Sequence, residues 1–126
     1  MSSVKVTHVY AVEAGDTHLA AFDLPVEHGR DRAELPNVPT TTMTITEMMV
    51  RRPTRGLHAE SRRQLLVILR GAFEITTTAG DRGRFQAGEC VLVDDVGAKG
   101  HTFADVGEDP LITVQIGIAE DWDVPR

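Results

Sequence analysis

The sequence has a single cysteine, no long apolar run and fewer positive than negative charges. One cysteine, Cys90, excludes an intramolecular disulfide, and its place in an apolar segment indicates a buried, unreactive thiol. No apolar run approaches the length that crosses a bilayer, and the N-terminus lacks the apolar region of a signal peptide. We therefore expect a soluble, cytoplasmic protein.

Positive charge is scarce. The 126 residues include 13 Lys and Arg against 19 Asp and Glu, which gives a formal net charge of -6. Nucleic acids and anionic membranes are bound by clustered positive charge. The composition therefore argues against both, and we expect the partner to be a small-molecule substrate or ligand.

Helical periodicity is also missing from the sequence. No window has the spacing of an amphipathic helix. Short runs of strand-forming residues instead alternate with glycine-containing turns. We predict strands at residues 4–12, 18–23, 40–51, 64–69, 73–78, 84–86, 90–93, 101–106 and 111–118. Regularly spaced short strands predict one all-β domain, either a sandwich or a barrel.

Three segments have less regular patterns. Residues 25–39 contain three prolines and are predicted to be a long connection with one helical turn at residues 31–35. The alternation of residues 40–51 is imperfect, so we predict a bulge or a change of face near Glu47. The acidic tail, residues 119–126, is expected to be loosely held.

The predicted strand at residues 64–69 is apolar on both faces. Leu66 and Ile68 share a face with Gln64, and the alternate residues of the strand form the other face. A strand of this kind is covered on both sides. A second subunit or a second layer of the same chain can supply the second cover. We expect a homodimer and keep a monomeric sandwich as the alternative.

Four side chains with lone pairs are candidate site residues: His58, Glu60, Gln64 and, further along the chain, His101. Imidazole, carboxylate and amide oxygen are the groups that bind a divalent metal where no thiolate is present. His58 and Glu60 are two residues apart and can share a face if their segment is extended.

The spacing of these residues resembles the first motif of small single-domain cupins. That motif has a Gly, then His-x-His, then a Glu, and a Gly seven residues after the Glu. Here Gly56 precedes His58, Glu60 stands at the second His position, and Gln64 stands at the Glu position. Gly71 follows seven residues beyond Gln64. The Arg-Arg-Gln sequence that ends at Gln64 is similar to a subgroup of bacterial monocupins.

The second cupin motif is matched with more changes. Gly88 opens it, Asp94 replaces the usual Pro, and a slightly longer loop leads to His101, which matches the motif His. Asp105 falls where the family has Asn. The resemblance is strongest over residues 56–103.

The resemblance implies a double-stranded β-helix, that is, a jelly-roll β-barrel, forming a single cupin domain over residues 1–126. Residues 1–39 would supply N-terminal strands and a long loop, residues 40–118 the barrel and residues 119–126 the tail. His58, Glu60, Gln64 and His101 would point into the barrel and could hold Fe, Mn, Ni or Zn. Two of the four usual ligands are replaced in this chain, so a site without metal stays an alternative.

Cupins host unrelated activities, so the function has to be argued from the site. We predict a small-molecule enzyme with His58, Glu60 and His101 as catalytic residues, carrying out lyase, isomerase or cyclase, or oxygenase-type chemistry. Without metal, Glu60 beside a histidine would form a proton-transfer pair, because an apolar barrel raises the pKa of a carboxyl. With metal, the ion would polarise the substrate oxygen. The alternatives are a non-catalytic sensor or carrier for a small molecule and a purely structural dimerising domain.

Overall fold

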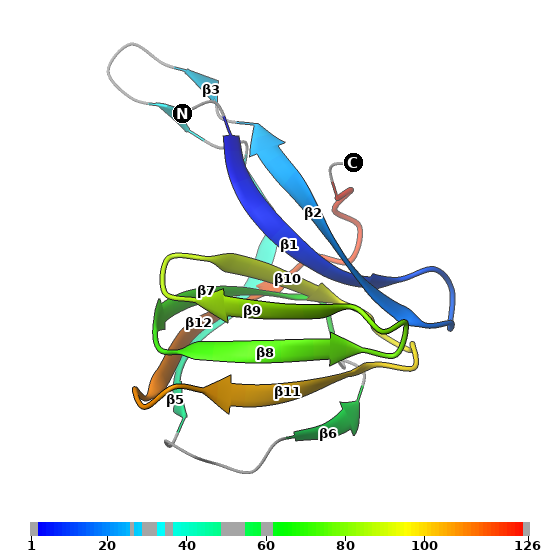
Figure 1. Ribbon diagram of the computed structural model, residues 1–126. Helices are drawn as coiled ribbons and strands as arrows, with labels where there is room; N and C mark the ends of the chain where they lie inside the picture. Colours follow the sequence, from blue (N-terminus) through cyan, green and yellow to red (C-terminus); the bar gives the residue numbers. More distant parts are fainter. Residues whose placement is uncertain are drawn as a thin grey trace.

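A computed structural model describes residues 3–25, 27–28, 33–34, 37–48, 55–58 and 62–124. Every helix or strand element found among these residues is a strand (Figure 1). The prediction of an all-β protein is therefore confirmed. Within the described ranges, no helix is long and apolar enough to cross a membrane.

Two sheets form the body of the molecule. The larger sheet has the order β2 (Thr17–Pro25), β1 (Ser3–Ala11), β10 (Cys90–Asp94), β7 (Gln64–Arg70), β12 (Leu111–Ile118) and β5 (Thr40–Met48). The smaller sheet has the order β6 (Arg55–His58), β11 (His101–Val106), β8 (Ala72–Thr77) and β9 (Arg82–Gln86). A short pair, β3 (Glu27–His28) with β4 (Ala33–Glu34), is separate.

The pairing is antiparallel except between β1 and β10, which run parallel. This two-sheet arrangement fits a β-sandwich or a jelly roll (Figure 1). Among the described strands the sheets do not close into the barrel that the sequence predicted.

The main core is a cluster of buried side chains contributed by both sheets. Phe73, Phe85 and Phe103 of the smaller sheet form its aromatic part, and the rings of Phe73 and Phe103 stack with their centroids 4.6 Å apart. The larger sheet contributes aliphatic residues, among them Ile68 and Val91. A fully buried side chain of this size stabilises the fold by about 1.5–3 kcal/mol. Because successive strand residues point to opposite faces, this core fixes which face of each strand is internal.

The outer face of the larger sheet carries a second apolar cluster. Leu65 of β7 belongs to it with Val6 and Ile118, and Trp122 of the C-terminal tail packs against them. The backbone of the tail also forms a hydrogen bond, from the Trp122 N–H to the Ala119 carbonyl at 3.2 Å. The tail is therefore packed as far as residue 124, and the expectation of a loosely held tail is wrong there. The chain itself covers part of the second face of β7.

Two other local predictions differ from the structure. Strand β6 was not expected, because its charged, proline-flanked sequence has no strand pattern of its own. Ala33 and Glu34 form β4, which pairs with β3, so the helical turn expected over residues 31–35 is wrong at these two positions. The rest of that turn and residues 49–51 of the predicted strand lie outside the described residues.

The irregularity of β5 has a different origin from the one predicted. Pairing with β12 is regular through Glu47, and the register shift lies between Met43 and Thr40. Met48 packs against the core, whereas the side chains of Met43 and Ile45 are 66% and 62% exposed. The imperfect alternation thus reflects apolar residues on the outer face and not a change of register near Glu47.

Candidate functional site

Three of the four residues predicted to form the site occupy strand ends. His58 is the last residue of β6, Gln64 the first of β7 and His101 the first of β11. All three strand ends are on the right-hand side of the molecule in Figure 1. Glu60 and the side chain of His58 lie outside the described part of the chain.

Backbone pairing brings His58 and His101 to neighbouring positions. His101 is the Cα partner of His58 on one side of β11 and of Thr77 on the other. The register between β11 and β6 shifts directly after this pair, since Phe103 is opposite Arg55. Bulges of this kind re-aim side chains next to binding sites. Two residues 43 positions apart in the chain are therefore cross-strand neighbours, as the site prediction requires.

Gln64 belongs to the opposite sheet and lies on its inner face. It alternates with Leu66 and Ile68, which pack in the main core. Its backbone partners are Val93 of β10 and Gly117 of β12. The position agrees with the prediction that Gln64 points into the interior.

A buried carboxylate fixes the orientation of His101. His101 is 2% exposed and Asp95 is 0% exposed, and Nδ1 of the imidazole lies 2.6 Å from Oδ2 of the carboxylate. The Thr17 hydroxyl donates to the same oxygen at 3.1 Å and accepts a hydrogen bond from the Gly100 N–H at 3.0 Å. The carboxylate, the hydroxyl and the imidazole thus form one buried network at the start of β11.

This network defines the chemistry that His101 can offer. A carboxylate only accepts hydrogen bonds, so the imidazole donates through Nδ1–H. In neutral histidine the lone pair then resides on Nε2. A histidine held in this way is the form that binds metals and that takes up protons, and carboxylate–histidine pairs of this type orient ligands in metal sites.

Asp95 was not among the predicted site residues. Asp94 falls at a motif position and the residues after it have the pattern of a loop, so Asp95 carried no signal of its own. Its proximity to His101 along the chain, six residues apart, was the one available hint. A loop of six residues can fold back on itself, but sequence alone does not say that it does.

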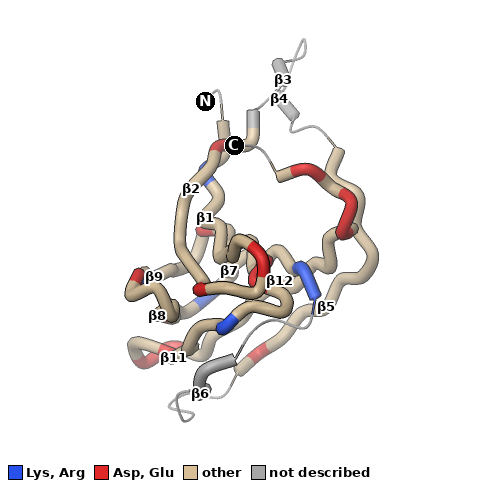
Figure 2. The backbone as a smooth tube through the Cα atoms, turned by 90° about the vertical axis from the view of Figure 1, so that its right-hand side faces the viewer, with Lys and Arg blue, Asp and Glu red and all other residues tan. Residues whose placement is uncertain are grey.

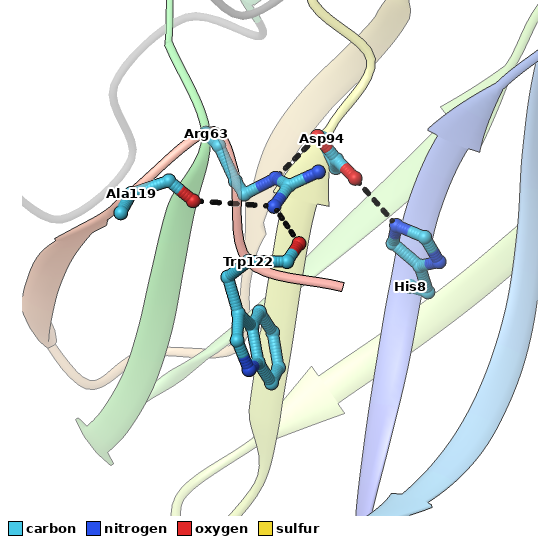
Figure 3. A network of polar contacts seen from close by, with 5 residues as sticks. All are labelled: His8, Arg63, Asp94, Ala119 and Trp122. Atoms are coloured by element: carbon cyan, nitrogen blue, oxygen red, sulfur yellow. Dashed lines mark hydrogen bonds and ion pairs between the residues drawn. The ribbon is translucent and has the colours of Figure 1, made fainter. Parts of the chain in front are cut away.

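A second polar network lies on the outer side of the larger sheet and joins strands to the C-terminal tail (Figure 3). Arg63 donates through Nε to Asp94 Oδ1 at 2.8 Å and through Nη1 to the Trp122 carbonyl at 2.7 Å. The Nε2 of His8 lies 3.0 Å from Asp94 Oδ2. Arg63 precedes Gln64 and Asp94 precedes Asp95, so this network fixes the backbone next to two candidate site residues.

The electrostatics of Asp94 follow from its partners. Burial alone would raise the pKa of the Asp94 carboxyl, but hydrogen bonds from His8 and Arg63 and the positive charge of Arg63 outweigh burial. The pKa of Asp94 is therefore held below its usual value. Cys90 shows the opposite direction, because partial burial raises the pKa of its thiol. An unreactive thiol was predicted at that position, and a raised thiol pKa agrees with it.

Two of the four predicted metal ligands, Gln64 and His101, have side chains in the described part of the chain. Among the described side chains, no three His, Cys, Asp or Glu residues form a group that could hold an ion. The side chains of the other two, His58 and Glu60, lie outside the described residues. His101 Nδ1 contacts the Asp95 carboxylate, and metal-binding histidines typically have such a partner on the ring nitrogen that does not face the ion.

Comparisons with known proteins add no family assignment. No protein-family model matches the sequence, and no curated protein matches it significantly. The resemblance to cupins stays a prediction, and a function has to be argued from the site.

Proposed function

We propose that the protein is a small-molecule enzyme of the cupin type whose active site lies inside the domain, at the end where β6 finishes and β7 and β11 begin. The observation that carries the proposal is the buried pair of His101 and Asp95, with Nδ1 and Oδ2 2.6 Å apart. The pairing of His101 with His58 and the inner position of Gln64 support it.

Burying an imidazole and a carboxylate lowers the stability of the fold unless their partners compensate for the lost hydration, so a purely structural role does not explain this pair. Removing polar groups from water costs free energy that hydrogen bonds only partly return, and apolar residues of similar size often stabilise a core as well or better. Titratable groups in the interior, locked in one orientation, are instead typical of sites that move protons or hold ions. His101 and Asp95 have this arrangement, and Thr17 completes it.

Roles follow from the chemistry of each group. His101 acts through Nε2, as a proton acceptor or as a ligand. Asp95 is a positioning residue, because it acts through His101. Glu60 and His58 complete the acid–base set, and Gln64 contributes a neutral amide for orienting the substrate.

The same residues fit a divalent ion, with His58, Glu60, Gln64 and His101 as the residues that would hold it. An ion of Fe, Mn, Ni or Zn would polarise a substrate oxygen. Lyase, isomerase or cyclase, and oxygenase-type reactions of small carbonyl or aromatic compounds are the matching reaction classes.

Elemental analysis of the purified protein, followed by a turnover screen with small carbonyl, nitrile and aromatic compounds, tests the proposal. The variants are Glu60→Ala, His101→Ala and Asp95→Asn, with His18→Ala as the control histidine because its side chain is 42% exposed. We expect turnover that Glu60→Ala and His101→Ala abolish, that Asp95→Asn lowers by about 10–100-fold, and that His18→Ala leaves unchanged.

The metal measurement separates the two forms of the mechanism. Stoichiometric metal that disappears in Glu60→Ala and His101→Ala supports the metal-dependent form. Turnover by metal-free protein supports acid–base catalysis. Tight binding of one compound with no turnover would overturn the enzyme proposal in favour of a sensor or carrier. Circular dichroism of each variant excludes loss of folding as the cause.

A further inference from the structure

One arginine joins the C-terminal tail to the strands that lead into the candidate site. Arg63 directly precedes β7, and its side chain is 15% exposed. Its Nη1 donates to the carbonyls of Ala119 and Trp122, at 3.3 Å and 2.7 Å (Figure 3). Its Nε donates to Asp94 Oδ1 at 2.8 Å. A planar guanidinium with several donors in fixed positions therefore connects two segments that are distant in the chain.

The backbone around Arg63 is held as well. The Arg63 carbonyl accepts a hydrogen bond from the Ile118 N–H at 3.1 Å, where β12 ends and the tail begins. Gln64, the next residue, pairs with Val93 of β10 in an antiparallel ladder. Arg63 and Asp94 come one step beyond this pair, so their side chains share the outer face of the sheet. Their ion pair thus fixes the ends of two neighbouring strands.

Both strand ends continue into the candidate site. Asp94 is the last residue of β10, and Asp95 follows it with a carboxylate 2.6 Å from His101 Nδ1. Asp94 and Asp95 share a planar peptide group, so a rotation that moves one carboxylate also moves the other. The contact between Arg63 and Asp94 on the outer face therefore limits how Asp95 can move on the inner face.

The charge of the tail makes its docking depend on local contacts. Three of residues 119–124 are acidic and none is Lys or Arg, and the acidic residues are red along the stretch that leads to the C-terminus in Figure 2. The whole chain has a net charge of -6, so its overall charge opposes the docking of this segment. Apolar packing of Trp122 and the hydrogen bonds from Arg63 to the tail carbonyls favour docking instead.

We propose that Arg63 is a positioning residue of the candidate site, and that it makes the orientation of His101 depend on docking of the C-terminal tail. The tail carbonyls hold the guanidinium, the guanidinium holds Asp94, and Asp94 fixes the backbone that carries Asp95. Release of the tail removes two acceptors from the guanidinium, which can then turn away from Asp94. The catalytic meaning of this coupling rests on the proposed function, in which His101 is the reacting histidine.

NMR spectroscopy of the histidine side chains measures the orientation of His101 in the full chain, without substrate. The Nδ1 proton between His101 and Asp95 exchanges slowly with water while the pair is intact, and faster when the pair opens. A His101→Ala sample identifies the resonance. Fluorescence of Trp122, the sole tryptophan, reports whether the tail is docked in each variant.

We expect Arg63→Gln to release the tail and to speed exchange of the His101 proton about tenfold, the factor for losing one hydrogen bond to a charged group. Arg63→Lys keeps the charge but has its donors on one nitrogen, so it should restore part of the protection. Trp122→Ala loosens the tail from its apolar side and should also speed the exchange. Arg70→Gln is the control, because Arg70 and Asp109 form an exposed ion pair, and it should change neither signal.

Two results would overturn the coupling: a released tail with unchanged exchange of the His101 proton, or a tail that stays docked in Arg63→Gln. Circular dichroism verifies that each variant is folded. If Arg63→Gln does not fold, Arg63→Lys and Trp122→Ala provide the same comparison between tail docking and proton exchange.

Turnover separates this inference from the proposed function. A wild type that shows the coupling by NMR but converts none of the screened compounds contradicts the proposed function and leaves the coupling in place. Turnover that Arg63→Gln leaves unchanged, although the tail is released, contradicts the positioning role and leaves the enzyme proposal in place.

Discussion

Asp94 and Asp95 are neighbours in the chain with entirely different partners. Asp94 bonds to Arg63 and His8 outside the main core, and Asp95 bonds to His101 and Thr17 in the interior. The alternation of side chains at a strand end explains the division, since consecutive residues point to opposite faces. Asp94 holds Arg63, which bonds to the tail. Asp95 orients the candidate catalytic His101 by accepting from its Nδ1.

The lowered pKa of Asp94 predicts a pH-dependent contribution to stability. A carboxyl with a lower pKa in the folded state stabilises the fold above its unfolded pKa, about 3.9, and this contribution is lost as the pH falls through the folded pKa. We expect Asp94→Asn to lower the free energy of unfolding by about 1–3 kcal/mol at neutral pH. At acid pH the difference in the free energy of unfolding between Asp94→Asn and wild type should shrink, because the Asp94 carboxyl is then protonated and both proteins lack its charge.

Urea unfolding at a series of pH values from about 7 to about 3 measures this difference. Asp109→Asn is the control, because Asp109 and Arg70 form an exposed ion pair with side chains 67% and 58% accessible. Its effect should stay within about 0.5 kcal/mol at every pH. Parallel pH profiles of Asp94→Asn and wild type would contradict a stabilising role for the charge.

At the scale of elements, strands with a repeating pattern were predicted well and those without one were not. The predicted limits of β11 and β12 agree with the structure, because apolar alternation and glycine turns bound both segments. Strand β6 has no such pattern, and it is extended because β11 pairs with it. The site combines both kinds of element, which is why His101 was easier to place than His58.

Gly71 connects β7 to β8, and a side chain at this connection should strongly lower the stability of the fold. Its φ of 81° is positive, and a Cβ there would lie 2.7 Å from the Pro110 carbonyl oxygen, which is backbone and cannot turn away. We expect Gly71→Ala to destabilise the protein by about 2–4 kcal/mol, combining an unfavourable φ with a steric clash.

Gly80→Ala is the matched control for this prediction. Gly80 also has a positive φ, 95°, but a Cβ there would meet nothing within 4 Å. The control should therefore cost about 1–2 kcal/mol, the strain alone. Thermal and urea denaturation of both variants give the comparison, and equal losses would show that contact with Pro110 is unimportant.

At the scale of the whole molecule, the C-terminal tail acts as a cover for the larger sheet. Trp122 lies against Leu65, Val6 and Ile118, and Arg63 holds its carbonyl. The apolar second face of β7 predicts a cover, either a second subunit or a second layer of the chain. The tail covers part of that face.

Truncation of the Trp122 side chain should expose this cluster. We expect Trp122→Ala to lower the free energy of unfolding by about 1.5–3 kcal/mol, the value for uncovering one large apolar side chain, and Trp122→Phe to cost less than half as much. Urea unfolding followed by circular dichroism measures both. In the wild type, Trp122 is the sole tryptophan, so its fluorescence reports release of the tail directly. A stability unchanged in Trp122→Ala would mean that the tail does not contribute to the fold.

The sequence by itself determined the β content, most strand limits, the inward face of β7 and three positions, His58, Gln64 and His101, that lie at one end of the molecule. These features depend on local alternation and on turns, which a linear pattern records. The tertiary structure decided the rest. It made β1 and β10 parallel neighbours, placed Asp95 rather than Asp94 against His101, and put Trp122 over the outer face. Such contacts join residues distant in the chain, and they are selected by the packing of the whole fold, which no local pattern contains.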